Sequence, residues 1–200
     1  MKKIFLAAVA LSAAFATPSM AFDNEPEPGF SQKAFVGMTI ANLRNYAADP
    51  KVGYSIGWLG EYMLPGAAGT YVNFGANMSM QGFKEYVFGS YKVSSHYLTV
   101  PIHVGYRYDI NDKWGAYADF GPYFALGLGA NHKFFKDVAD GGYDANRFDC
   151  GLGFNVGGEY NKKLSLTFGF NWGLTGTIDM PSPASDVKTF NSTITLGYRF

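Results

Sequence analysis

The clearest pattern in the chain is a strict alternation of apolar and small polar residues. In residues 164–175, LSLTFGFNWGLT, every even position is apolar, whereas the odd positions hold Ser, Thr, Gly and Asn. A period of two residues predicts a β-strand whose faces meet different surroundings. No amphipathic helix of normal length fits between the alternating segments. About eight such segments fill the chain, near 33–42, 53–64, 70–82, 94–109, 114–129, 147–160, 163–175 and 189–200.

The connections between these segments alternate in length. Long ones are expected near 43–52, 83–93, 130–146 and 176–188. Short ones, near 65–69, 110–113 and 161–163, contain the Gly, Pro, Asn and Asp that are typical of hairpin turns. In an up-and-down barrel with an even number of strands, alternate connections lie at opposite rims. The alternation of long and short connections therefore predicts an all-β fold. We expect an eight-stranded antiparallel transmembrane up-and-down β-barrel with short periplasmic turns and both termini periplasmic.

The composition of the polar face decides which face is outside. A soluble sandwich, such as a secreted one, would carry many Lys and Glu there, but this face carries Gly, Ser, Thr and Asn. Nine lysines are expected in loops, turns or strand ends, because a narrow lumen offers a long Lys neither room nor a counter-charge. The apolar face is thus expected to meet lipid. These lysines are Lys51, Lys84, Lys92, Lys113, Lys133, Lys136, Lys162, Lys163 and Lys188.

Aromatic residues near strand ends are expected to form the two interfacial girdles of a membrane barrel. They are Tyr54, Trp58, Tyr62, Tyr71, Trp114, Tyr160, Trp172 and Tyr198.

The first residues predict export. Two lysines precede an apolar run that is too short for a membrane helix, and Ser19-Met20-Ala21 is a small-x-small cleavage site. Residues 1–21 are therefore interpreted as a signal peptide of a Gram-negative cell envelope protein, although a retained N-terminal anchor is the alternative. Residues 22–32 are expected to form a periplasmic lead-in, and residues 33–200 the barrel domain.

Four stretches resemble a small outer-membrane β-barrel family that includes PorT-like and "porin family" proteins. They are YLTVPIHVGYRYD at 97–109, YADFGPYFALGLGA at 117–130, FDCGLGFNVGGEY at 148–160 and LTFGFNWGLTG at 166–176. The resemblance implies an eight-stranded barrel in the outer membrane and no enzyme activity. The word "porin" is a family label and does not by itself imply a pore.

The C-terminus resembles an outer-membrane insertion signal, which the barrel-assembly machinery reads. Outer-membrane lipid and this machinery are thus the expected partners, and the chain is expected to be a monomer. The neutral net charge gives no reason to expect nucleic acid. The signal consists of Ile194, Leu196, Tyr198 and Phe200.

Several charged residues share the inward face. Because eight strands leave a lumen that side chains just fill, these charges should be paired, and Arg107 and Arg199 should each meet an inward carboxylate. A path for protons or small ions is the alternative use of such a network. The set is Glu61, His103, Arg107, Asp119, Asp149, Glu159 and Arg199.

Catalytic and metal chemistry have weak support. Ser94 and His96 share the lipid-facing side, as a lipid-active enzyme could require, but no acidic residue to orient the histidine can be named. The three histidines lack metal-ligand spacing, and no cofactor is expected. We therefore expect a non-catalytic outer-membrane protein that serves envelope structure or surface interaction, with a transport or secretion component and a lipid-active enzyme as alternatives.

Overall fold

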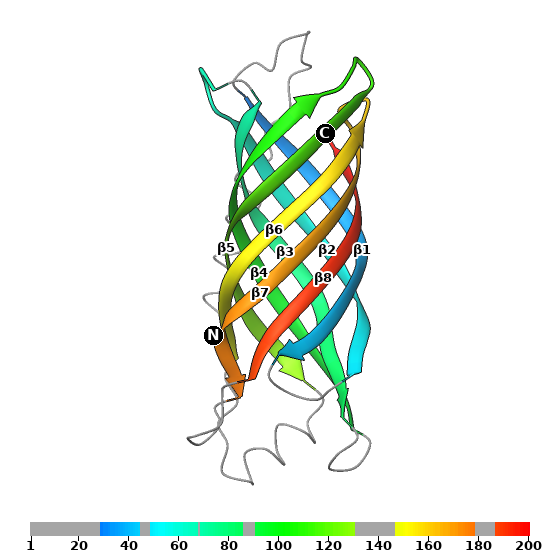
Figure 1. Ribbon diagram of the computed structural model, residues 1–200, viewed down its shortest axis with the longest axis vertical. Helices are drawn as coiled ribbons and strands as arrows, with labels where there is room; N and C mark the ends of the chain where they lie inside the picture. The colour runs from blue at the N-terminus through cyan, green and yellow to red at the C-terminus, as the bar shows by residue number, and fades with distance from the viewer. Residues whose placement is uncertain (1–28, 45–48, 68, 86–90, 131–146, 179–186) are drawn as a thin grey trace.

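The computed structural model describes residues 29–44, 49–67, 69–85, 91–130, 147–178 and 187–200. Eight strands form a closed barrel in which each strand pairs antiparallel with its sequence neighbours and β1 pairs with β8 (Figure 1). The predicted fold class is confirmed. The strands are β1 Phe30–Arg44, β2 Asp49–Met63, β3 Thr70–Glu85, β4 Tyr91–Asp109, β5 Trp114–Ala130, β6 Phe148–Tyr160, β7 Leu164–Ile178 and β8 Val187–Arg199.

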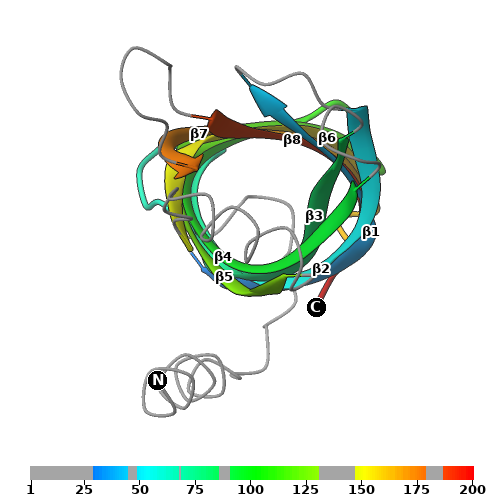
Figure 2. The same cartoon turned by 90° about the horizontal axis from the view of Figure 1, so that it is seen from below.

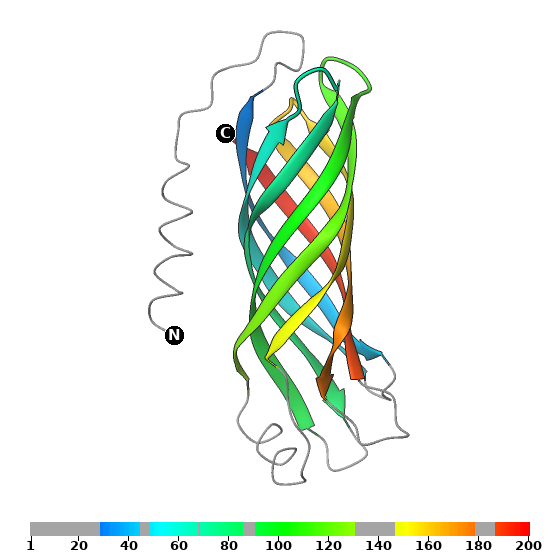
Figure 3. The same cartoon turned by 90° about the vertical axis from the view of Figure 1, so that its left-hand side faces the viewer.

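The view along the barrel axis shows an unbroken ring of strands (Figure 2). One end, here called the turn rim, carries the short turns at 110–113 and 161–163 together with Phe30 and Phe200 (Figure 3). The opposite end, the loop rim, carries the ends of the strands near Arg44 and Val187. No helix in the described ranges has the length and hydropathy needed to cross a membrane.

Three of the four expected long connections are clearly shorter than the sequence pattern predicted. Strands β1 and β2 leave only 45–48 between them, β3 and β4 leave 86–90, and β7 and β8 leave 179–186. The reason is that strand pairing continues beyond the alternating segments, with Glu85 still paired to Tyr91. Polar residues at this rim remain in the ladder because backbone hydrogen bonds do not depend on the side-chain pattern.

The outer wall is apolar, as the alternation predicts. In β7, Leu164, Leu166 and Phe168 are exposed, while Ser165 between them is buried. Along β4 the outward positions from Tyr106 to His96 span about ten residues. At a rise of about 3.3 Å per residue and a tilt of about 40° they cover about 25 Å, which is the height of a membrane barrel's apolar band.

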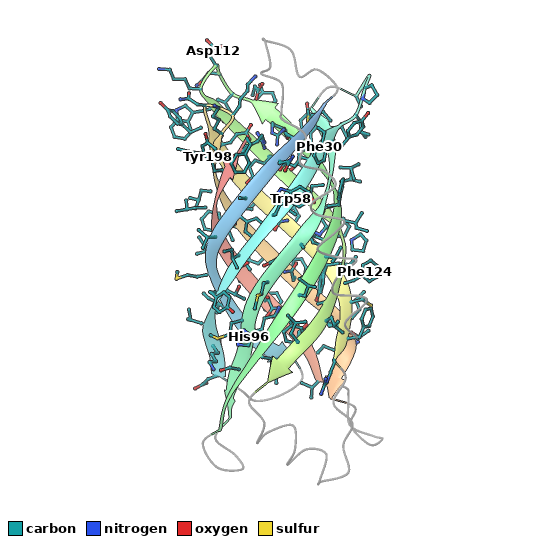
Figure 4. All side chains as sticks on the ribbon, turned by 180° about the vertical axis from the view of Figure 1, so that it is seen from behind. Phe30, Trp58, His96, Asp112, Phe124 and Tyr198 are labelled. Atoms are coloured by element: carbon teal, nitrogen blue, oxygen red, sulfur yellow. The ribbon has the colours of Figure 1, made fainter. Side chains whose placement is uncertain are left out.

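Aromatic rings flank this band at both ends. At the turn rim, the rings of Trp114 and Tyr160 lie 4.8 Å apart. Toward the loop rim, Trp172 and Phe190 lie 6.0 Å apart. Figure 4 places Phe30 and Tyr198 toward the turn rim and His96 toward the loop rim.

Two residues depart from their predicted positions. Tyr71, expected in a girdle, is fully buried in the lumen. Lys33, which the pattern left at the edge of the first segment, lies inside β1, and its side chain is buried next to Glu61. A lumenal lysine is accommodated here because a carboxylate stands within 2.9 Å of its ammonium group. The rule that excluded lysine from the lumen was therefore wrong at this position.

A charge on the outer wall should be costly at mid-height and tolerated at the rim. Phe168 pairs with Val156 and Ile194, whereas Leu164 pairs with Tyr160 and Tyr198 at the turn rim. We expect Phe168→Arg to lower the free energy of folding into lipid vesicles by about 2–4 kcal/mol and Leu164→Arg by about 0–1 kcal/mol. Urea titration of refolding in vesicles measures both. Equal, small losses would mean that this wall faces water.

Candidate functional site

An ion-pair cluster crosses the lumen near the turn rim. It joins five residues from five strands: Lys33, Glu61, Arg107, Glu159 and Arg199. Each comes from an inward position of its strand, so the alternation that builds the wall also directs these side chains into the lumen.

Glu61 is the centre of this ion-pair cluster. Its two carboxylate oxygens lie 2.9 Å from the Lys33 ammonium, 2.7 Å from the Arg107 guanidinium and 2.8 Å from that of Arg199. The Glu61 side chain has no solvent exposure. A buried charge needs partners of opposite sign, and here three cations share one carboxylate.

Glu159 completes the ion-pair cluster by bridging the two arginines. Its oxygens lie 3.1 Å from Arg107 Nε and 2.8 Å from Arg199 Nη1. Two tyrosine rings cover the cations, with Arg107 over Tyr71 and Lys33 over Tyr117, each 4.9 Å from the ring centroid. Both arginines therefore lie against inward carboxylates, as the sequence pattern required.

A second polar group lies next to the ion-pair cluster. His103 Nδ1 is 2.7 Å from Asp119 Oδ1, and the Asn155 amide donates to the same oxygen at 2.7 Å. The Tyr71 hydroxyl donates to the other oxygen of Asp119. Tyr71 thereby connects the two groups, since its ring also contacts Arg107.

Glycines make room for the His103 imidazole. A Cβ atom at Gly121 would lie 3.0 Å from the ring, and one at Gly153 would lie 2.7 Å from it. His103 Nε2 is buried and has no hydrogen-bond partner among the described residues. It borders a cavity of about 70 Å³ at the middle of the barrel, which is room for a few water molecules.

Asp149 departs from the expected pairing of inward charges. It is buried nearer the loop rim, apart from the ion-pair cluster, and no cation lies within ion-pair distance among the described residues. Instead it accepts hydrogen bonds from Tyr123 at 3.1 Å and from Thr175 and Thr189 at 2.6 Å. Three hydroxyl donors replace the counter-charge, because hydrogen bonds to a carboxylate also stabilise its charged form.

Glu61, Arg107, Glu159 and Arg199 of the ion-pair cluster belong to the set predicted from the sequence, whereas Lys33 does not. Alternation within 33–42 places Lys33 on the same inward face as Gly37 and Thr39. The lumenal position of Lys33 could therefore have been predicted from the sequence. The same alternation in β3 places Tyr71 on the inward face with Asn73, so the burial of Tyr71 could have been predicted in the same way.

Ser94 and His96 do not pair with each other. The Lys51 ammonium donates to the Ser94 hydroxyl, and His96 Nδ1 lies 3.1 Å from the Tyr54 hydroxyl. A nucleophile needs its base within hydrogen-bond reach. The contacts that both residues make are thus those of a polar patch on the outer wall, and they do not favour a lipid-active enzyme.

Removing the central carboxylate should destabilise the barrel. Glu61→Gln leaves three buried cations with one carboxylate, and we expect a loss of about 3–5 kcal/mol. The control is Asp109→Asn, which breaks the exposed Lys162–Asp109 pair and should cost less than about 1 kcal/mol. Urea-induced unfolding in detergent micelles measures both. A loss for Glu61→Gln as small as that of the control would contradict the central role of this carboxylate.

Several solved barrel structures are similar in fold to this chain. Outer membrane protein OprG from Pseudomonas aeruginosa is 14% identical, with a TM-score of 0.50 over 86% of this chain and 96% of that chain. Neisserial surface protein A is 15% identical, with a TM-score of 0.47 over 86% and 97%. Outer Membrane Protein W of E. coli is 14% identical, with a TM-score of 0.45 over 86% and 98%.

At these identities the likeness to OprG shows the fold alone. A search of curated protein sequences finds no match. The family model described as "Outer membrane protein beta-barrel domain" matches residues 7–200. Since this match covers nearly the whole chain, the protein belongs to the outer membrane protein beta-barrel domain family and is a barrel of the bacterial outer membrane.

Proposed function

We propose that this protein is a non-catalytic outer-membrane barrel with a closed lumen that serves envelope structure or surface interaction. The observation that carries the proposal is the ion-pair cluster around Glu61. Cations from β1, β4 and β8 converge there on carboxylates from β2 and β6. Side chains from both sides of the ring thus meet across the lumen, as the narrow interior of an eight-stranded barrel allows.

The orientation in the membrane is part of this proposal. Barrels of the outer membrane have short turns in the periplasm, and the described turns at 110–113 and 161–163 are short. The turn rim, with the C-terminal Phe200, is therefore assigned to the periplasm. The connections at the loop rim then face outward, where loops commonly carry binding functions.

One observation supports a second candidate function, the passage of protons or very small solutes. The central cavity is lined by polar side chains such as Ser55, Asn77 and Thr99, and also by His103, whose Nε2 has no hydrogen-bond partner among the described residues. Water in this cavity could connect His103 with Tyr123, which contacts Asp149. The ion-pair cluster blocks the same route for larger solutes.

Planar-bilayer recording tests the closed lumen. We expect the wild-type barrel to show no stepwise ion current. We expect current steps in the triple variant Glu61→Ser, Arg107→Ser, Arg199→Ser, which removes the bulk of the ion-pair cluster and leaves one cation, Lys33, with one carboxylate, Glu159.

Two controls make this recording decisive. A heat-dependent gel shift confirms that the variant is a folded barrel, and Asp109→Asn, in an exposed pair at the turn rim, should remain silent. Stable current steps in the wild type that the triple variant leaves unchanged would refute the closed lumen. A proton flux without ion steps, detected with a pH-sensitive dye in vesicles and lost in His103→Phe, would favour the second candidate.

The proposed insertion signal can be separated from a role in stability. Ile194, Leu196, Tyr198 and Phe200 are all exposed on the outer wall. We expect Phe200→Ala to lower the amount of assembled barrel in cells several-fold while purified protein still folds in detergent. Leu164→Ala, an exposed neighbour of Tyr198 in the register, is the control that should assemble normally. Equal assembly of both variants in cells would speak against the signal.

A further inference from the structure

The seam between β1 and β8 has two cations in directly opposed positions at each end. At the turn rim Lys33 is paired with Arg199, and at the loop rim Arg44 is paired with Lys188. Like charges directly opposite each other in neighbouring strands destabilise a sheet. A nearby anion would therefore stabilise each of these pairs.

The inward pair obtains its anion from the chain itself. Glu61 lies 2.9 Å from the Lys33 ammonium and 2.8 Å from the Arg199 guanidinium, so one carboxylate neutralises both strands of the seam. This contact shows how the protein compensates an opposed cation pair inside the lumen.

The outward pair has no such carboxylate among the described residues. Arg44 is exposed and Lys188 is partly exposed. Strand alternation places both on the outer wall, two residues beyond the outward pair of Asn42 and Phe190. No ion pair of either side chain with a described carboxylate is formed.

A further cation lies on the neighbouring strand β2 in the same sector of the loop rim. It is Lys51, at the strand end that also holds Asp49. Among these described side chains, three cations outnumber one carboxylate. We call the three cationic positions the loop-rim arc: Arg44, Lys51 and Lys188.

The wall next to this loop-rim arc combines hydrogen-bond donors with an apolar surface. The β2–β3 register shifts between Pro50 and Ser55, and the Lys51 ammonium reaches the Ser94 hydroxyl on β4. A bulge of this kind redirects side chains out of the regular pattern. Val52 and Ile40, farther from the rim on the same wall, are exposed and apolar.

We propose that the loop-rim arc binds the phosphate groups of an anionic lipid whose acyl chains lie on the apolar wall beneath. A phosphate has several acceptor oxygens, so it can bridge two cations on neighbouring strands, which stand about 5 Å apart at Cβ. The lipid is favoured over a free anion because the cations border directly on the lipid-facing surface. This inference does not depend on whether the lumen is closed.

Lipid selectivity in vesicles tests the proposal. The full-length protein, refolded in phosphatidylcholine vesicles at low salt, is probed with spin-labelled phosphatidic acid and spin-labelled phosphatidylcholine. We expect the wild type to prefer phosphatidic acid by about tenfold, and Arg44→Gln/Lys188→Gln to lose about fivefold or more of this preference, since each cation near an anionic surface contributes about fivefold.

The matched control lies at the opposite rim. Lys113→Gln/Lys163→Gln removes two exposed lysines of the turn rim and should keep the preference. An equal loss in both double variants would overturn the proposal, because it would show attraction by overall charge. Displacement of the labelled lipid by inorganic phosphate, but not by chloride of equal ionic strength, would also overturn it in favour of a site for free phosphate.

A charge swap separates lipid binding from folding. Arg44→Glu creates an opposite-charge pair with Lys188 across the seam. If the cation pair serves an outside anion, this variant should be at least as stable as the wild type in neutral detergent and should lose its preference for phosphatidic acid. Lower stability in neutral detergent, or an unchanged lipid preference, would contradict the proposal.

Discussion

The pairing of β1 with β8 is the contact on which the rest of this molecule depends. In lipid, each unpaired backbone N–H or C=O group is costly, so a sheet can cross the membrane only when it has no free edge. Twelve paired positions, from Lys33–Arg199 to Arg44–Lys188, close this ring. Closure also defines an inside, and it brings Lys33 and Arg199, which are far apart in sequence, next to Glu61.

The lumen compensates its charges in two different ways along its length. Near the turn rim, the guanidinium groups of Arg107 and Arg199 and the carboxylates of Glu61 and Glu159 meet at 2.7–3.1 Å. Nearer the loop rim, hydroxyl groups surround Asp149. Between these regions a cavity of about 70 Å³ is lined mostly by amides and hydroxyls, with Lys33 and Asp119 also at its wall. A network of arginines is bulky and fixed, whereas Thr and Asn are small, so the closed and the open parts of the lumen follow from residue size.

Much of this arrangement could be predicted from the sequence, because one regular pattern controls it. Alternation correctly assigned the faces of β4 to β8, including the inward positions of Arg107 and Glu159, and it predicted eight antiparallel strands. Two residues depart from the prediction because residue type is a weaker guide here than position in the alternation. Tyr71 was assigned to a girdle because it is aromatic, and Lys33 was overlooked because lysine is rare in a narrow lumen. The hydroxyl partners of Asp149 could not be predicted, because Thr175 and Thr189 reach it across strands whose register the pattern does not fix.

The two rims differ in the chemistry that holds the wall at the membrane surface. The turn rim has aromatic pairs such as Trp114 with Tyr160, and Tyr198 with Phe200 at 5.3 Å. Its exposed Lys162 is neutralised by Asp109. At the loop rim, the described side chains of β8, β1 and β2 include three cations, Arg44, Lys51 and Lys188, and one carboxylate, Asp49. An aromatic ring suits any headgroup region, because it needs only an apolar side and a hydrogen-bonding edge. Opposed cations repel each other and are stabilised by nearby anions, so a lipid surface that differs between the two rims would suit this wall.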